Sequence, residues 1–217
     1  MKTPHLFYVP LAAAALAIPA AFAQTGATVT TQAQVQTPAA SIQDRNTLDV
    51  QRDVNQQQRI EQGLKSGQLT THEAGRLERQ EAHIDQMEKR ADRNGSISAA
   101  EQARINAEQN RVSQEIYADK HNAVTGNPNS KSSERLQADV QRNLNQQDRI
   151  EQGLQSGRLT NREAGKLEAG QARVDRAQAH AAANGRVNAT EQARIQHKEN
   201  VQSHRIYNKK HNARQAG

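Results

Sequence analysis

The sequence predicts an all-α protein built from two tandem three-helix units, and three observations lead to that prediction. A segment that begins at Asp49 recurs without a gap from Asp139, 90 positions later. Within each copy the apolar residues return at steps of three, four and seven, which is the spacing of one buried helix face. No stretch shows the alternation of apolar and polar residues that indicates a strand.

The N-terminal residues predict export from the cell. Residues 1–23 begin with Met1-Lys2, continue with the apolar run "LFYVPLAAAALAIPAAFA" and end in a small-x-small triplet, the pattern of a cleaved secretory signal peptide. No later apolar run is long enough to span a bilayer, so we expect no membrane span. The location predicted by this pattern is periplasmic or secreted. Residues 24–43 are rich in Gln, Thr and Ala without a helical period, and we expect this tract to be disordered.

The repeat divides the remaining chain into three parts. Helical repeat 1 covers residues 44–123, helical repeat 2 covers residues 134–217, and a short linker, residues 124–133, joins them. The linker reads "VTGNPNSKSS", a composition typical of loops. This division predicts that the two repeats fold as separate units.

Each repeat contains two breaks that separate three helices. In the first repeat the breaks lie at Ser66-Gly67 and Asn94-Gly95, and the second repeat has Ser156-Gly157 and Asn184-Gly185 at the matching places. Glycine at such a break supplies the left-handed residue that commonly ends a helix.

After each break a hydroxyl or amide residue is followed three positions later by glutamate. This spacing predicts a capping box, in which the first side chain accepts a backbone N–H and the glutamate reaches back to the cap N–H. The four pairs are Thr70 with Glu73, Ser98 with Glu101, Thr160 with Glu163, and Asn188 with Glu191.

The same breaks resemble the second half of an EF-hand calcium loop. An alternative hypothesis is therefore weak calcium binding, best supported at Asp92, Asn94 and Glu101. Calcium needs six to eight oxygen ligands, and Arg90 stands where the first carboxylate of such a loop belongs. We therefore favour the capping interpretation and expect no calcium binding at this loop tighter than about millimolar.

The repeats end in "IYADKHN" and "IYNKKHN", which place a tyrosine, a lysine and a histidine on one helix face. One interpretation is a contact point for an anion, a metal or a protein partner. The other is structural: the tyrosine packs on a neighbouring helix, the lysine and histidine meet the C-terminal end of the helix dipole, and the asparagine caps the helix. The residues concerned are Tyr117, Lys120, His121, Tyr207, Lys210 and His211.

Composition argues against several classes of function. The chain has no cysteine, so thiol catalysis and thiolate metal sites are excluded. Its 29 basic and 23 acidic residues are interleaved, a pattern that predicts carboxylates on solvated helix faces rather than in a tuned acid–base pair. Beyond residue 23 the only aromatic residues are Tyr117 and Tyr207, which leaves almost no surface for stacking nucleic-acid bases.

The units "SGxLTxxEA", "NGxxxxxE" and "IYxxKHN" resemble those of uncharacterised exported bacterial tandem-repeat helical proteins with degenerate EF-hand-like turns. That resemblance covers both repeats and implies an exported location and a helical fold, but no activity. Together with the composition it predicts a non-enzymatic binding or scaffold module, with no cofactor. The expected partner is an envelope protein or an anionic surface polymer and not a nucleic acid. The alternatives are calcium binding through the degenerate loops and a periplasmic chaperone or stress role.

Overall fold

The computed structural model describes residues 42–94 and 97–213, and these residues form six long α-helices and one 3-10 turn, without strands. The elements are α1 (Ile42–Ser66), α2 (Thr71–Ala91), η1 (Asp92–Asn94), α3 (Ala99–Lys120), α4 (Lys131–Gln155), α5 (Asn161–Ala182) and α6 (Ala189–Lys210). The predicted all-α class is confirmed. The signal peptide and the tract as far as residue 41 lie outside the described residues, and α1 begins inside the predicted tract, at Ile42.

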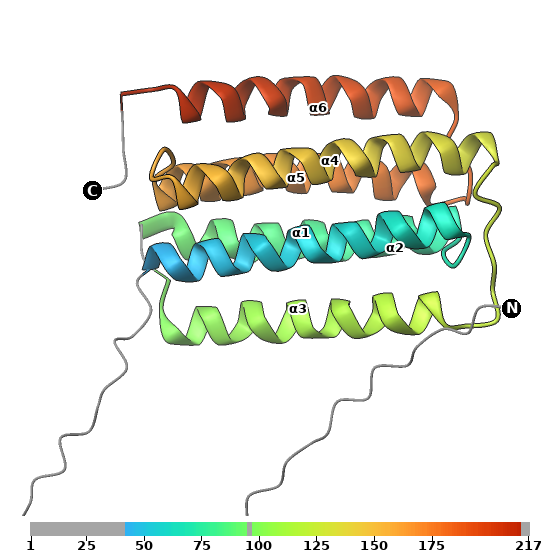
Figure 1. Cartoon of the computed structure of the whole chain (residues 1–217), viewed down its shortest axis with the longest axis horizontal. Coiled ribbons are helices and arrows are strands. Elements are labelled where there is room, and N and C mark those ends of the chain that lie inside the picture. Colours follow the sequence, from blue (N-terminus) through green and yellow to red (C-terminus); the bar gives the residue numbers. More distant parts are fainter. Residues whose placement is uncertain (1–41, 95–96, 214–217) are drawn as a thin grey trace, which may run out of the picture. The chain divides into compact units, whose positions relative to one another are not determined.

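Four helices, α1, α2, α4 and α5, form a central bundle, and α3 and α6 lie on its two outer sides (Figure 1). Helix α3 packs against α1 and α2 of its own repeat, while α6 packs against α4 and α5. Across the centre, α1 lies beside α4 and α2 beside α5, each pair antiparallel (Figure 1). Equivalent helices of the two repeats therefore face one another, as two subunits of a symmetric dimer would.

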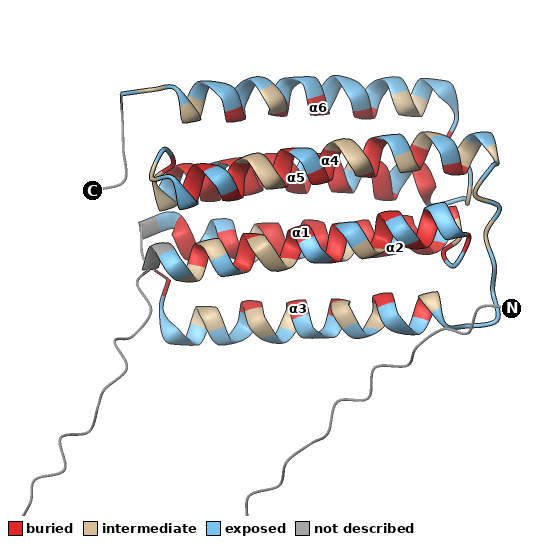
Figure 2. Cartoon of the chain, viewed as in Figure 1, coloured by how far each residue is buried: buried red, intermediate tan, exposed pale blue. Residues whose placement is uncertain are grey.

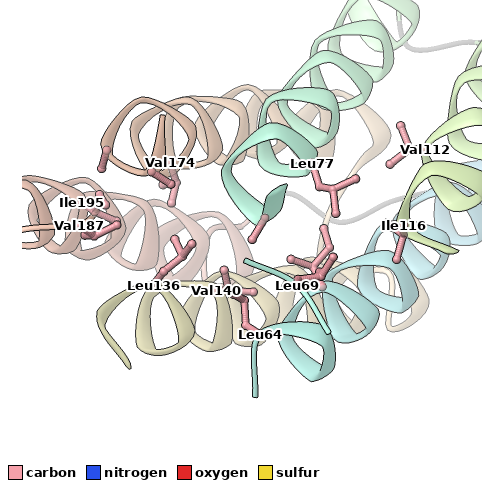
Figure 3. Close-up of a cluster of buried hydrophobic side chains, with 14 of the residues drawn as sticks. Leu64, Leu69, Leu77, Val112, Ile116, Leu136, Val140, Val174, Val187 and Ile195 are labelled. Atoms are coloured by element: carbon pink, nitrogen blue, oxygen red, sulfur yellow. The ribbon is translucent and has the colours of Figure 1, made fainter. Parts of the chain in front are cut away.

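The two repeats share one hydrophobic core. Its largest cluster joins Leu64 and Leu77 of the first repeat to Leu136, Val140 and Val174 of the second (Figure 3). The most extensive contact between any two helices is that of α2 with α5. The prediction of separately folding units does not match this arrangement, because each repeat covers apolar surface of the other.

The segment between the repeats is anchored to the first of them. The N–H of Gly126 donates to the carbonyl oxygen of Gly67 (2.8 Å). Ser130 caps α4, which starts at Lys131, so the last three residues of the predicted linker are helical.

The turns and caps have the local geometry that their residue types favour. Gly67, Gly157 and Gly185 have φ of 75°, 66° and 76°, in the left-handed region where a side chain would cause strain. All four capping boxes are present, at the N-termini of α2, α3, α5 and α6.

Replacing the cap of α3 is expected to destabilise the protein. Ser98 Oγ accepts the N–H of Glu101 (3.2 Å), and Glu101 Oε2 accepts the N–H of Ser98 (3.0 Å). Ser98→Ala removes the first of these bonds and should lower the free energy of unfolding by about 1 kcal/mol. Urea unfolding measures this difference. Thr190→Ala, in the exposed first turn of α6, is the control and should have little effect, and an equal loss in both variants would contradict the capping role.

Glycine allows α2 and α5 to approach each other closely. A side chain at Gly75 would overlap with Ala182, and one at the equivalent Gly165 would overlap with Asp92. The two contacts are related by the repeat, so the antiparallel crossing of α2 and α5 depends on the absence of a Cβ at both positions.

Gly75→Val is expected to force the two repeats apart locally. Overpacking a tight core contact costs about 1–3 kcal/mol. Thermal unfolding should show this loss, whereas Ala107→Val on the exposed side of α3 should cost only a few tenths of a kcal/mol, the difference in helix propensity. A Gly75→Val variant as stable as this control would show that α2 and α5 do not pack as described.

Candidate metal centre

The middle of the central bundle is rich in buried carboxyl groups. Glu78, Glu81, Asp85 and Glu88 on α2 are each no more than 3% exposed, and Glu168 and Asp175 on α5 are each 1% exposed. The buried sides of α1, α2, α4 and α5 face the centre of the bundle (Figure 2). The prediction that the carboxylates lie on solvated helix faces is therefore wrong for these two helices.

Four of these groups converge on one point. Asp53 of α1, Asp85 and Glu88 of α2, and Glu168 of α5 each bring one carboxylate oxygen within 4.8 Å of the others. We call this set the carboxylate centre. Asp85 and Glu88 share a helix face because they are three residues apart. Glu168 comes from the second repeat, so the centre forms only where the two repeats pack together.

Amide side chains hold one oxygen of three of these carboxylates, and one of the bonds runs from Gln109 Nε2 to Glu88 Oε1 (3.4 Å). Gln109 Nε2 donates to Asp53 Oδ1 (2.9 Å), and Gln147 Nε2 donates to Glu168 Oε2 (3.3 Å). In all four groups another oxygen is buried without a hydrogen-bond partner: Asp53 Oδ2, Asp85 Oδ2, Glu88 Oε2 and Glu168 Oε1. A buried polar atom without a partner is costly, so these four atoms indicate either protons shared between the carboxyl groups or a bound cation.

The charge of the centre is not balanced by side chains. Within the described ranges, no lysine, arginine or histidine forms an ion pair with Asp53, Asp85, Glu88 or Glu168. Burial raises the pKa of Glu168 to about 8, and burial together with the charge of Glu168 raises the pKa of Asp53 well above its usual range. Unpaired buried charges cost several kcal/mol each, so the centre must hold either protons or a cation.

The size of the centre fits a cation with oxygen ligands. Calcium–oxygen bonds are about 2.3–2.6 Å long, so two ligands on opposite sides of the ion lie about 4.6–5.2 Å apart. Oxygens within 4.8 Å of one another can therefore bind one ion together. Carboxylate metal sites of other four-helix bundles are likewise built from inward-facing side chains of several helices.

A small cavity adjoins the centre towards the end of the bundle where η1 lies. It has a volume of about 10 Å³, room for about one water molecule. Asp49 and Asp92 line it together with Glu88 and Glu168 of the carboxylate centre. Burial raises the pKa of Asp49 to about 6 and that of Asp92 to about 7. The cavity extends the acidic region from the centre towards η1.

The repeat creates a second set of positions that mirrors the centre, but amides replace two of its acids. Asn143, Asp175, Gln178 and Glu78 occupy the places of Asp53, Asp85, Glu88 and Glu168. Asn143 Nδ2 donates to Asp175 Oδ1, and Gln57 Nε2 donates to Glu78 Oε2 (3.1 Å). Each acid of the mirror set thus accepts an amide N–H, and the mirror set holds half as many acids as the carboxylate centre.

The loop that resembles a calcium site has its acids occupied by other contacts. Glu101 is engaged in the capping box, where its Oε2 accepts both the N–H and the hydroxyl of Ser98. Asp92 points inward, is 4% exposed and accepts a hydrogen bond from Asn46 (2.9 Å). The side chain of Asn94 lies outside the described residues. Calcium binding by this loop is the alternative hypothesis, and it would require Glu101 to leave its capping box.

The tyrosine and the asparagine of the motif that ends each repeat do not have the roles that the structural interpretation predicts. Tyr117 is 61% exposed and stacks on His121, with the ring centroids 4.1 Å apart, and the same stack forms in the second repeat. The tyrosines therefore do not pack on a neighbouring helix. The histidines, and not the asparagines, occupy the C-cap position. Lys210 Nζ donates to the carbonyl oxygen of Arg149 on α4 (2.9 Å), and Lys120 is half-buried.

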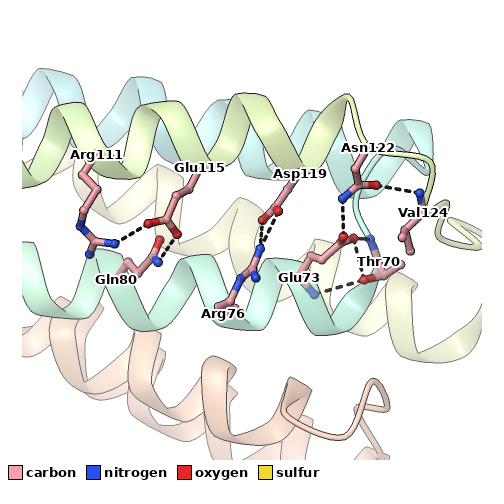
Figure 4. Close-up of polar contacts among 9 residues, drawn as sticks. All are labelled: Thr70, Glu73, Arg76, Gln80, Arg111, Glu115, Asp119, Asn122 and Val124. Carbon is pink, nitrogen blue, oxygen red and sulfur yellow. Dashed lines mark hydrogen bonds and ion pairs between the residues drawn. The ribbon is translucent and has the colours of Figure 1, made fainter.

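The asparagine of this motif connects the third helix to the second. Asn122 Nδ2 donates to Glu73 Oε1 (2.8 Å), the free oxygen of the capping box (Figure 4). Asn212 makes the same bond to Glu163 (2.6 Å). The motif thus has a structural role that its sequence does not reveal.

None of the helices described here combines the length and the apolar character that crossing a membrane requires. No protein-family model, curated protein or solved structure matches this chain.

Proposed function

We propose that the protein binds one divalent cation in the carboxylate centre, as a non-enzymatic, exported helical protein. The observation that carries this proposal is the convergence of four carboxylates, each with a buried oxygen that lacks a partner. None of the four forms an ion pair with a lysine, arginine or histidine among the residues that the structure describes. The signal-peptide pattern of residues 1–23 supports the exported location.

The ligand set favours a hard cation such as Ca²⁺ or Mn²⁺. All four candidate ligands are carboxylates, and oxygen ligands suit calcium, magnesium and manganese, whereas zinc and copper prefer nitrogen and sulfur. Magnesium is the weaker candidate because it keeps several of its waters. The adjoining cavity has room for about one.

Protons balance the remaining charge. Four carboxylates exceed the charge of one divalent ion. Side-chain hydrogen bonds also join carboxyl groups to one another, in the pairs Asp53 with Glu88, Asp85 with Glu168, and Asp85 with Asp175. Two carboxyl groups can share such a bond only when one of them is protonated. We therefore expect a bound cation together with at least one retained proton.

Titration calorimetry tests the proposal. Chelator-treated mature protein is titrated with Ca²⁺ and, separately, with Mn²⁺, and we expect saturable binding of one ion per chain. Asp53→Asn, which introduces the residue found at the mirror position, should abolish the binding. Glu101→Gln should leave it unchanged, whereas loss of binding in Glu101→Gln alone would place the ion in the EF-hand-like loop. Absence of binding of either ion would refute the proposal and leave the centre as a protonated cluster.

A further inference from the structure

Polar contacts between side chains bridge the interface of α2 and α3 alongside the C-terminal half of α3, whereas a hollow of about 420 Å³ remains at its N-terminal end. Three acids lie along the α2-facing side of α3: Glu108, Glu115 and Asp119. Arg76 on α2 pairs with Asp119, and Gln80 donates to Glu115 (Figure 4). Arg111 pairs with both Glu108 and Glu115. The acids of this interface thus have their partners within the same repeat.

At the matching positions of the second repeat every one of these acids is replaced by a base. Lys198, Arg205 and Lys209 on α6 stand where α3 has Glu108, Glu115 and Asp119. Across the interface α5 keeps its own positive charges, with Lys166 in place of Arg76 and Arg173 in place of His83. The same fold therefore has an internally paired interface in one repeat and an excess of positive charge in the other.

The basic side chains line an open groove. Two adjoining hollows, of about 400 and 200 Å³, share Arg173 and Arg205. Gly170 lines the second hollow where the first repeat has Gln80, and the buried side chain of Gln202 occupies the space that a Cβ at Gly170 would fill. The cationic lining of the two hollows consists of Lys89, Lys166, Arg173, Lys198, Arg205 and Lys209.

Acidic side chains of the protein neutralise little of the positive charge of these six residues. Neither hollow has a carboxylate among its described lining residues. Of the six cations only Lys209 has an ion pair in the part of the chain that the structure describes, with its Nζ 3.6 Å from Glu163 Oε1. That oxygen already accepts a hydrogen bond from Asn212. The other five are exposed, so their charges are available to a ligand in the groove.

We propose that the groove between α5 and α6 binds a phosphate-bearing polyanion. Arginine presents several N–H donors in a planar fork that matches phosphate, and Arg173 and Arg205 lie where the two hollows meet. The four lysines add point charges along the groove, which suits a chain of phosphates better than a single small anion. Among the described residues that line the groove, His197 is the only one with an aromatic ring, so the groove offers little aromatic surface for stacking bases, and this disfavours nucleic acid.

The test restores the charges of the first repeat. The triple variant Lys198→Glu, Arg205→Glu, Lys209→Asp introduces the residues that α3 has at these positions, so its fold should be retained with an unchanged circular dichroism spectrum. Mature protein free of divalent cations is titrated with inorganic polyphosphate, and separately mixed with vesicles containing phosphatidylglycerol. The first probe represents a free phosphate chain and the second a lipid headgroup.

We expect at least one probe to bind, and its affinity to fall as salt is added. The triple variant should bind that probe at least about tenfold more weakly, the loss expected for one charge-assisted hydrogen bond. A control variant carries three reversals outside the groove, Arg79→Glu, Arg162→Glu and Arg194→Glu, and has the same net charge. The proposal is overturned if neither probe binds, if the two variants lose affinity equally, or if single-stranded DNA binds as tightly through the same residues. Because the titrations contain no divalent cation, these outcomes are independent of the carboxylate centre.

Discussion

Cation-free protein is expected to lose stability as the pH rises from about 5 to about 8, and a saturating divalent cation is expected to restore it. Burial raises the pKa of Glu168 to about 8 and that of Asp175 to about 7. The folded protein therefore keeps these protons at pH values where the unfolded chain has already released them. Such groups stabilise the fold fully below their unfolded pKa of about 4, and this contribution disappears as the pH rises through about 7 to 8.

A cation replaces the lost protons in this account. At a concentration one hundred times its dissociation constant it should add about 2.7 kcal/mol, which raises the unfolding temperature by roughly 5 to 10 °C for a chain of this size. Thermal unfolding at several pH values, in chelator and in Mn²⁺ or Ca²⁺, measures both effects. At about pH 5 the cation should have much less effect, because protons compete for the same oxygens. Cation-free stability that increases between pH 5 and 8 would contradict the buried, uncompensated charge of the centre.

Replacing one ligand should remove the response to cations but should not weaken the cation-free fold. Glu168→Gln keeps the size of the side chain and an oxygen that can accept the hydrogen bond of Gln147. It also removes a buried acid, so cation-free protein should become more stable at about pH 8. The shift of the unfolding temperature on adding the cation should fall to near zero.

Glu78→Gln provides a matched control within the same chain. Glu78 occupies the mirror position, is equally buried and accepts a hydrogen bond from Gln57 as Glu168 does from Gln147. This variant should also gain cation-free stability, but it should keep the full thermal shift on adding the cation. Equal loss of the shift in both variants would show that the ion does not distinguish the carboxylate centre from its mirror.

Local patterns in the sequence predict the helices well. The glycine breaks and the hydroxyl–glutamate pairs correspond to real turns and capping boxes, because both signals depend on contacts within a few residues. Packing of one repeat on the other is not a local property. The stripe that contains Leu77 and Ile84 predicts one buried face for α2 and does not reveal that the face with Glu78, Asp85 and Glu88 is buried as well.

The carboxylate centre could not be identified from residue types alone. Acids spaced along a helix are normally solvated, but here the packing of α5 against α2 buries the acids of α2. One signal was present in the sequence: Asp53 and Glu88 become Asn143 and Gln178 in the second repeat, while Asp85 and Glu78 are matched by acids. If these residues lay on the surface, nothing would favour an amide in one repeat over the acid in the other. In a shared interior, however, an amide avoids the cost of one more buried charge. The charge reversals between α3 and α6 can also be seen in the sequence. They indicate a difference between two equivalent interfaces only once α3 and α6 are known to pack in the same way.

The most direct test of the account is to locate the ion. Crystals of the mature protein grown with Mn²⁺, measured near the manganese absorption edge, should give one anomalous peak per chain. The account predicts this peak within about 2.0–2.6 Å of carboxylate oxygens of Asp53, Asp85, Glu88 and Glu168. A peak beside Glu101, a peak only on the molecular surface, or no peak at manganese concentrations that saturate the thermal shift would contradict it.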